Sequence, residues 1–316
     1  MRRSSTVSNA TNRLRAGLAL LAAVGLCSGT SAAAEPKVHA GRAQVYQSLP
    51  SNSLEDVTTA EALMTLDVRN QNIPATRIWK LLEHGEKVEC LSCIPRVATL
   101  LYDDNAKTRE ISAWWLRRRI FGVFGPGEVY SRLLETLSSA NAPEARRAQA
   151  AEAIGEFLKP AGVRHVARAA VADSSSRVRR SAVAALQRLN SEGPGQELGR
   201  ALGDSAEDVR LAALQAAISI NVFSSADAVV ARLSDESPLV RRRAAEALGS
   251  MRVADAVVGL VALASEATEG DANVRVAAIW ALGQIGDAGG RDAVEAALAD
   301  SSSLVRNAAA IARRRL

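Results

Sequence analysis

The chain has 316 residues, of which 48% are hydrophobic, 3% aromatic and 23% charged, and its net charge is +5. This length and apolar content support one or two cores and argue against disorder, while the scattered charges exclude a multi-span membrane protein. The first 34 residues hold four arginines and no acid, so they account for four of the five net charges and leave little basis for nucleic-acid binding. Few aromatics beside abundant Ala, Leu and Val indicate helices packed through small residues.

The N-terminus resembles an export signal. Its arginines Arg2, Arg3, Arg13 and Arg15 precede a twelve-residue apolar run at 16–27, which is too short to span a bilayer comfortably. Small residues then end at Ala34, where we expect cleavage, so that 1–34 is a signal peptide and 35–53 a flexible leader. An uncleaved anchor and a lipoprotein at Cys27 are the alternatives. Lipoprotein signals resemble one another in having a small residue before the Cys, however, and Leu26 stands there. We therefore expect a periplasmic or secreted protein.

Residues 54–102 are predicted to form an irregular N-terminal helical cap, with helices of about 74–84 and 95–102 that begin at prolines. The connection between them holds Cys90 and Cys93 in a C-x-x-C spacing. A structural disulfide fits an oxidising compartment. A redox-active pair is the alternative, since a helix N-terminus lowers a thiol pKa. A c-type haem would need His at position 94, where Ile stands, and zinc would need further ligands.

From residue 103 onward, a repeat of about 31 residues organises the chain. In each unit an Asp or Asn precedes an Arg, usually by six positions: Asp103/Arg109, Asn141/Arg147, Asp173/Arg179, Asp204/Arg210, Asp235/Arg241, Asp271/Arg275 and Asp300/Arg306. Val precedes five of these arginines, and small or aliphatic residues follow it at four, seven and eight positions, which predicts one apolar face on a helix. We expect the Asp to cap this first helix and the Arg to reach the Asp of an adjacent unit.

Each unit then continues through a turn into a second apolar helix. We expect these second helices at about 127–138, 160–171, 195–202, 225–233, 253–267 and 289–298. A last first helix, 303–316, has no partner, and its three terminal arginines would solvate the exposed end of the stack.

The segments 235–249 (DESPLVRRRAAEALG) and 273–286 (NVRVAAIWALGQIG) resemble HEAT-like repeats of the phycobilisome-lyase type. The resemblance covers about residues 103–316. It implies an all-α, right-handed α-solenoid of about six to seven helix pairs, with a concave surface built by the second helices. Such repeats are specific for fold and say little about function.

Two groups of enzymes share these repeats. Deoxyhypusine hydroxylases are similar in fold but hold two irons on His-Glu pairs, whereas His39, His84 and His165 are each followed by another residue type. Phycobilin lyases work inside the cell, which the export signal opposes. We therefore predict no catalytic residue, no metal and no cofactor, and we interpret His165 as a lone polar surface residue.

Two surfaces are candidates for binding. The first combines Trp114 with Arg117 and Arg118, because Trp and Arg are favoured interface anchors. The alternative is that these aromatics only fill the space between the cap and the regular repeats. The second surface lies on the second helices, which carry Arg168, Arg200 and Arg232. Acidic residues on the same helices make it mixed in charge, which favours protein recognition over polyanion binding.

Together these features predict an exported, non-catalytic protein-binding scaffold that serves another envelope protein. It would bind no nucleic acid and would not be an integral membrane protein once the signal is cleaved. One alternative is a thiol-redox or maturation accessory that uses Cys90 and Cys93. Another is a HEAT-repeat enzyme of the lyase or oxidoreductase kind.

Overall fold

The computed structural model describes residues 73–84, 93–120, 127–191, 193–220, 223 and 225–316. All described residues belong to one unit of the chain, residues 45–316. The predicted signal peptide, leader and Cys90 lie outside the described residues. Within the described residues, no helix is both long enough and apolar enough to cross a bilayer.

All regular elements of the described chain are helical, and they follow the predicted order. The first helices are α5 (Ala106–Ile120), α7 (Glu144–Phe157), α9 (Ser176–Leu189), α11 (Glu207–Ser219), α13 (Pro238–Met251), α15 (Ala272–Ile285) and α17 (Ser303–Ala312). The second helices are α6 (Gly127–Ser138), α8 (Val163–Ala172), α10 (Gly195–Ala201), α12 (Ala226–Val230), α14 (Val257–Leu263) and α16 (Arg291–Ala296). The all-helical repeat fold is therefore confirmed.

Short 3₁₀ turns complete several second helices and the cap. They are η4 (Leu100–Tyr102), η5 (Pro160–Gly162), η6 (Ala231–Ser234), η7 (Ala254–Ala256), η8 (Ala288–Gly290) and η9 (Ala297–Ala299). The described part of the cap consists of α3 (Ala75–His84) and α4 (Ile94–Thr99), which agree with the two predicted cap helices.

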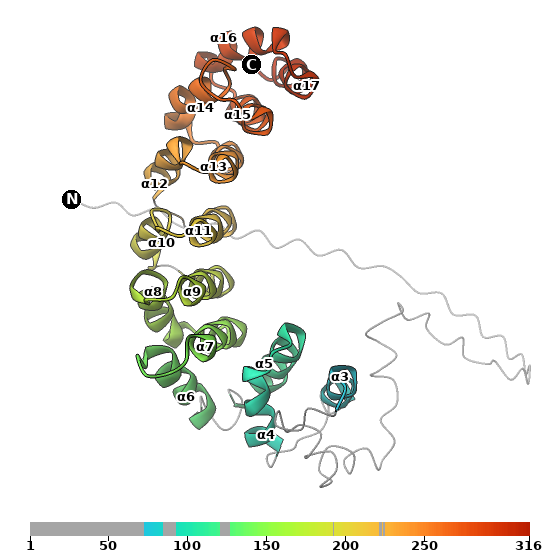
Figure 1. The fold of residues 1–316 in the computed structure, drawn as a ribbon, viewed down its shortest axis with the longest axis vertical. Helices are drawn as coiled ribbons and strands as arrows, with labels where there is room; N and C mark the ends of the chain where they lie inside the picture. Colours follow the sequence, from blue (N-terminus) through green and yellow to red (C-terminus); the bar gives the residue numbers. More distant parts are fainter. Residues whose placement is uncertain (1–72, 85–92, 121–126, 192, 221–222, 224) are drawn as a thin grey trace, which may run out of the picture. The chain divides into compact units, whose positions relative to one another are not determined.

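From α6 to α17 the helices form two layers, with first helices in one and second helices in the other (Figure 1). Each first helix turns its small residues inward: on α9, Val178, Ala182, Ala185 and Leu186 are all buried. This is the apolar face that the spacing predicts, and its small side chains allow close packing between neighbouring first helices.

Glycines bring some first helices closer still. A Cβ on Gly249 of α13 would lie 2.7 Å from the Cα of Ala281 on α15, and one on Gly155 of α7 would lie 2.8 Å from the Cα of Ala185 on α9. Both distances are shorter than real contacts, so only glycine permits these approaches.

An arginine ladder joins successive units, as the sequence predicts. Five guanidinium groups each bind the carboxylate of the following unit at nitrogen–oxygen distances of 2.6–3.0 Å; the pairs are Arg147–Asp173, Arg179–Asp204, Arg210–Asp235, Arg241–Glu269 and Arg275–Asp300. The same group also holds its own unit: Nη1 of Arg179, for example, donates to the carbonyl of Asp173 at 2.9 Å. Each rung therefore ties the turn of one unit to the carboxylate of the next.

Two details of the predicted ladder are wrong. The acid of the sixth unit is Glu269, six positions before Arg275, and Asp271 instead caps α15 by accepting from the backbone N–H of Asn273. Arg109 binds Glu152 on α7 because the following unit has Asn141, which carries no charge, where other units have an acid.

The aspartates of the regular units are not helix caps. Asp173 accepts from the backbone N–H of Ser175, and α9 begins one residue later with Ser175 as its N-cap. Asp204 and Asp300 accept in the same way, from Ala206 and Ser302. These carboxylates order the turn before the helix, which leaves their other lone pairs for the arginine of the preceding unit.

Candidate functional site

The aromatic cluster on α5 is engaged in packing. Trp115 is fully buried, and Trp114 is half-buried with the guanidinium carbon of Arg118 at 6.0 Å from its ring centre. Arg117 donates from Nη1 to the carbonyl of Glu156, near the end of α7, at 3.1 Å. Of the three side chains predicted to bind a partner here, Arg117 thus ties α5 to α7, whereas Arg118 contacts Trp114 of its own helix.

On the second helices, acids within the same segment neutralise two of the three predicted arginines. Arg200 on α10 lies 3.4 Å from a carboxylate oxygen of Glu197, one turn earlier. Arg232 in η6 lies 3.2 Å from Asp235, which also receives the ladder bond from Arg210. These two positions are mixed in charge, as the sequence predicts.

Arg168 on α8 differs from both. It is exposed, and within the described part of the chain it forms no hydrogen bond or ion pair. Arg164 and His165 on the same helix are also exposed and form no such contact there. Because α8 carries no Asp or Glu, its cations have no neutralising partner within their own helix.

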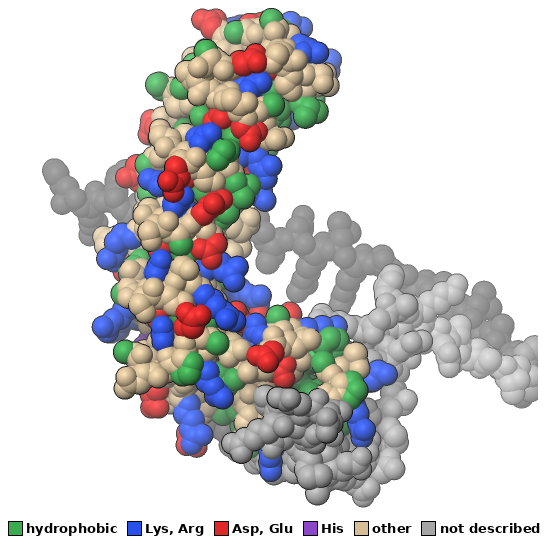
Figure 2. All heavy atoms as spheres, viewed as in Figure 1, with side chains coloured by type: hydrophobic (Ala, Val, Ile, Leu, Met, Phe, Trp, Pro, Cys, Tyr) green, Lys and Arg blue, Asp and Glu red, His purple; other side chains and the backbone are tan. Residues whose placement is uncertain are grey.

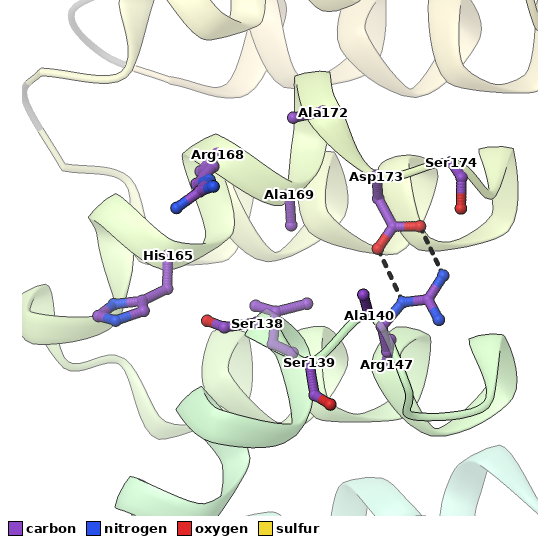
Figure 3. A pocket seen from close by; sticks show the side chains of 11 residues that line it. Ser138, Ser139, Ala140, Arg147, His165, Arg168, Ala169, Ala172, Asp173 and Ser174 are labelled. Carbon is purple, nitrogen blue, oxygen red and sulfur yellow. Dashed lines mark hydrogen bonds and ion pairs between the residues drawn. The ribbon is translucent and has the colours of Figure 1, made fainter.

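Arg168 and His165 line a groove between the end of α6 and α8, with a volume of about 360 Å³. They lie at one end of it, and the Arg147–Asp173 pair lies at the other (Figure 3). The lining between them is small and polar or apolar: Leu137, Ser138, Ser139, Ala140, Ala169, Ala172 and Ser174. The groove is therefore open, lined by several hydroxyl groups and cationic at one end.

Asp173 does not neutralise the cationic end of the groove, where Arg168 and His165 lie. Burial alone would raise the pKa of its carboxyl, but hydrogen bonds from Arg147 and from the backbone N–H of Ser175 outweigh burial and lower the pKa below its ordinary value. Asp173 is thus ionised, and its two carboxylate oxygens accept from Arg147 at 2.8 Å each, while one of them also accepts from the backbone N–H of Ser175. Arg168 points away from this pair (Figure 3).

A second groove, of about 440 Å³, occupies the equivalent place between η6 and α14. Its wall is made by Gly259, Ala262 and Leu263, whose spacing matches that of His165, Arg168 and Ala169. The Arg241–Glu269 pair takes the place of Arg147–Asp173. The two grooves thus share their frame and differ in the cations that α8 alone contributes.

Comparison with protein families identifies these units. A model of HEAT repeats matches residues 130–218 and 226–314, which together make up more than half of the chain. The chain belongs to the HEAT-repeat family. The groove beside α8 therefore lies within the first matched block of HEAT repeats.

Solved HEAT-like structures share the architecture at low sequence identity. YibA from Escherichia coli is 20% identical, with a TM-score of 0.55 over 84% of this chain and 95% of that one. Kap95p, the yeast importin-beta, in a structure that describes its binding to RanGDP, is 13% identical, with a TM-score of 0.60 over 85% of this chain and 44% of Kap95p. The CpcE–CpcF phycocyanin lyase of Nostoc sp. PCC7120 is 18% identical over 71% of this chain and 94% of that one, with a TM-score of only 0.38. No curated protein matches the chain.

Within the described residues, no group of three or more His, Cys, Asp or Glu side chains is placed to hold a metal ion. Cys93 is fully buried at the N-cap position of α4, and Cys90 lies outside the described residues. What the groove beside α8 can do chemically is accept an anion.

The sequence singles out Arg168 but does not separate it from Arg200 and Arg232. It also treats His165 as an isolated residue. The available signal is local: α8 places Arg164, His165 and Arg168 within five residues and includes no acid, whereas the second helices at Arg200 and Arg232 hold acids nearby.

Proposed function

We propose that this chain is an exported, non-catalytic protein-binding scaffold of the cell envelope. The observation that carries the proposal is the open groove beside α8, whose cations are held on packed helices and are not neutralised by described residues. On the face drawn in Figure 2, basic and acidic side chains are interspersed along the stack, which suits protein surfaces better than a polyanion. The likeness to Kap95p supports the idea, since that stack binds a protein.

The mechanism of such a scaffold is preorganisation. The ladder bonds and the close approaches at Gly155 and Gly249 fix each helix against its neighbour. Binding a partner would then cost little conformational entropy in the scaffold, so that the free energies of many weak contacts sum to a useful affinity. Export rests on the sequence of residues 1–34, and cleavage after Ala34 stays part of the proposal.

Affinity capture tests the scaffold function. The tagged full-length chain is expressed in its own cells, crosslinked mildly in the intact envelope and purified, and the co-purifying proteins are identified by mass spectrometry. The N-terminus of the purified chain is sequenced in the same experiment, with Glu35 expected as its first residue. The control is a tagged, exported protein of similar size without repeats.

One or a few envelope proteins enriched over that control would support the scaffold. Equal recovery with both baits would overturn it. An N-terminus that still begins at Met1, or recovery from the cytoplasm alone, would contradict export while leaving the binding function open to the same capture in whole cells.

We also propose that Cys90 and Cys93 form a structural disulfide before α4. Burial of the Cys93 side chain favours this reading over the redox alternative, because exchange needs an accessible sulfur. Cys90→Ser, which leaves the buried side chain in place, is expected to lower the melting temperature of the cap without altering capture. Unchanged melting together with lost processing of the captured partner would favour redox chemistry instead.

A further inference from the structure

We infer that the groove beside α8 binds an extended, carboxylate-rich segment of the protein partner. This inference rests on the proposed scaffold function and names the chemistry of what the scaffold holds. The residues that would bind the segment are His165 and Arg168, which line the groove with Ser138 and Ser139 on the facing wall, and Arg164, which lies one turn before Arg168 on α8, outside the lining.

The first step is charge. An exposed guanidinium with no carboxylate beside it gains more from an incoming carboxylate than one already paired, because nothing has to be displaced. Arg168 and Arg164 meet this condition among the described residues. Arg200 and Arg132 do not, since Glu197 and Glu128 already bind them.

The second step is spacing. Arg164 and Arg168 lie four residues apart on α8, so their side chains leave one face of the helix about 6 Å apart along its axis. Alternate residues of an extended peptide lie about 6.6 Å apart and point to the same side. A segment with acids at alternate positions therefore matches both arginines at once.

The third step is the lining of the groove. Ser138, Ser139 and Ser174 offer hydroxyl groups along the groove, while Ala169 and Ala172 leave room for a peptide backbone. The ionised Asp173 at the far end would repel a second carboxylate, although its pair with Arg147 weakens that repulsion. The acidic residues of the segment are thus directed to the end of the groove that holds Arg168 and His165 (Figure 3).

The probe is a fluorescein-labelled, ten-residue peptide that alternates glutamate and alanine and ends in an amide. Its binding to the purified full-length chain is followed by fluorescence anisotropy at low and at physiological salt. Arg168→Ala is expected to raise Kd about tenfold, the usual loss for one charge-assisted hydrogen bond, and Arg164→Ala/Arg168→Ala to raise it further. Arg200→Ala is the matched control, expected to change Kd less than twofold.

A second test restores binding instead of removing it, by moving the two arginines of α8 to the second groove. Val258 and Ala262 on α14 correspond to Arg164 and Arg168 in the second groove, and both are exposed, Val258 to 83%. Val258→Arg/Ala262→Arg in the Arg164→Ala/Arg168→Ala background is expected to restore binding to within a few-fold of the original. Circular dichroism of every variant checks that the helices remain folded.

Three results would overturn the inference. One is equal weakening by Arg168→Ala and Arg200→Ala, which means diffuse charge attraction. Another is equal binding of a peptide in which glutamine replaces glutamate. The third is tighter binding of a single-stranded oligonucleotide at the same residues, which would assign the groove to a nucleic acid. A partner that is captured equally well by Arg168→Ala would leave the scaffold function standing and remove this groove from it.

Discussion

Single arginines determine how one repeat meets the next. Arg275 shows the arrangement in a deeply buried form. Its guanidinium binds both oxygens of Asp300 at 2.9 Å and the carbonyl of Glu269 at 2.9 Å, and the side chains of Arg275 and Asp300 are each only 3% exposed. A buried pair contributes little compared with a well-packed apolar pair, but an orphaned partner is costly. The ladder is therefore vulnerable to single substitutions.

We expect Arg275→Met to destabilise the C-terminal repeats by about 3–5 kcal/mol, because it leaves the Asp300 carboxylate buried without its partner. Urea unfolding followed by circular dichroism measures the loss. Arg180→Met is the control: it breaks the exposed pair with Asp208, at 3.7 Å, and should cost less than about 1 kcal/mol. Similar losses of unfolding free energy in the two variants would show that the buried pair stabilises the fold no more than the exposed one.

The ladder also makes stability depend on pH. Hydrogen bonds from Arg275 lower the pKa of Asp300; for Asp173, Asp204 and Glu269 burial acts to raise the pKa, but hydrogen bonds from their arginines and the backbone outweigh it, and the net shift is downward. A lowered pKa means that the folded state holds the proton less tightly than the unfolded state. The stabilisation is therefore complete above the ordinary values and is lost as the pH falls through the folded ones.

We expect the melting temperature to be nearly constant down to about pH 5 and then to fall steeply below the ordinary pKa values, 4.5 for Glu and 3.8 for Asp. Thermal melts at pH values from 7 to 3 measure this. Asp300→Asn should melt lower at pH 7 and show a shallower acid slope. A melting temperature that does not change between pH 5 and pH 3 would contradict a role for these carboxylates in holding the repeats together.

At the scale of elements, the distance between first helices depends on glycine. Gly249→Ala would bring its Cβ to 2.7 Å from the Cα of Ala281 and to 2.8 Å from the ring of Trp280, so we expect α13 and α15 to separate slightly at a cost of about 1–3 kcal/mol. Gly270→Ala is the control, because its Cβ would meet nothing within 4 Å. That change should be neutral or stabilising by about 0.4–1 kcal/mol. Urea unfolding of both variants measures the difference in stability. Equal stabilities would mean that α13 and α15 accommodate the added methyl group at no cost.

The elements themselves were predictable, because the repeat places its small residues at a fixed helical spacing. The range predicted for the second helix at 127–138 is that of α6, and the one at 195–202 differs from α10 by one residue. The sequence predicts that each ladder arginine pairs with an acid of another unit, but it does not predict in every case which acid that is. Glu269 replaces Asp271 as the paired acid, and Arg109 reaches Glu152, because the choice depends on which carboxylate faces the guanidinium in space.

The groove beside α8 was only partly predictable. Its arginine is visible in the sequence, and so are the acids three residues from Arg200 and from Arg232. The groove itself lies between the end of α6 and α8, and it follows only from how these two helices pack. The same limit applies to Trp114, Arg117 and Arg118. The sequence shows an unusual cluster, and the structure shows that Arg117 binds the end of α7 and that Trp115 fills the core.

At the scale of the whole molecule, each repeat contacts mainly its neighbours. Along the first-helix layer, α7 packs on α9, α9 on α11, α11 on α13, α13 on α15 and α15 on α17. Stability in such a stack is a sum of local terms and neighbour interfaces, so that damage at one end stays near that end.

We expect a chain that ends after Gly286 to remain folded through α11 and to lose stability in α13 and α15. The truncation removes α16 and α17, and with them the cover over Leu282 and Gly283 and the Asp300 partner of Arg275. Hydrogen exchange measures protection helix by helix, with the full-length chain as reference. An equal loss of protection in α7 and α9 would show instead that the stack unfolds as one unit.

The ladder has a consequence for how such a chain can change its length. Every regular rung presents the same joint, with an arginine on one side and a carboxylate that orders a turn on the other. Removing residues 204–234 as a block would set Arg179 against Asp235, which is the same kind of acid in the same kind of turn as the one it binds now. Duplication or loss of whole units during evolution thus needs no newly shaped junction, and the number of repeats can vary while the groove beside α8 is kept intact.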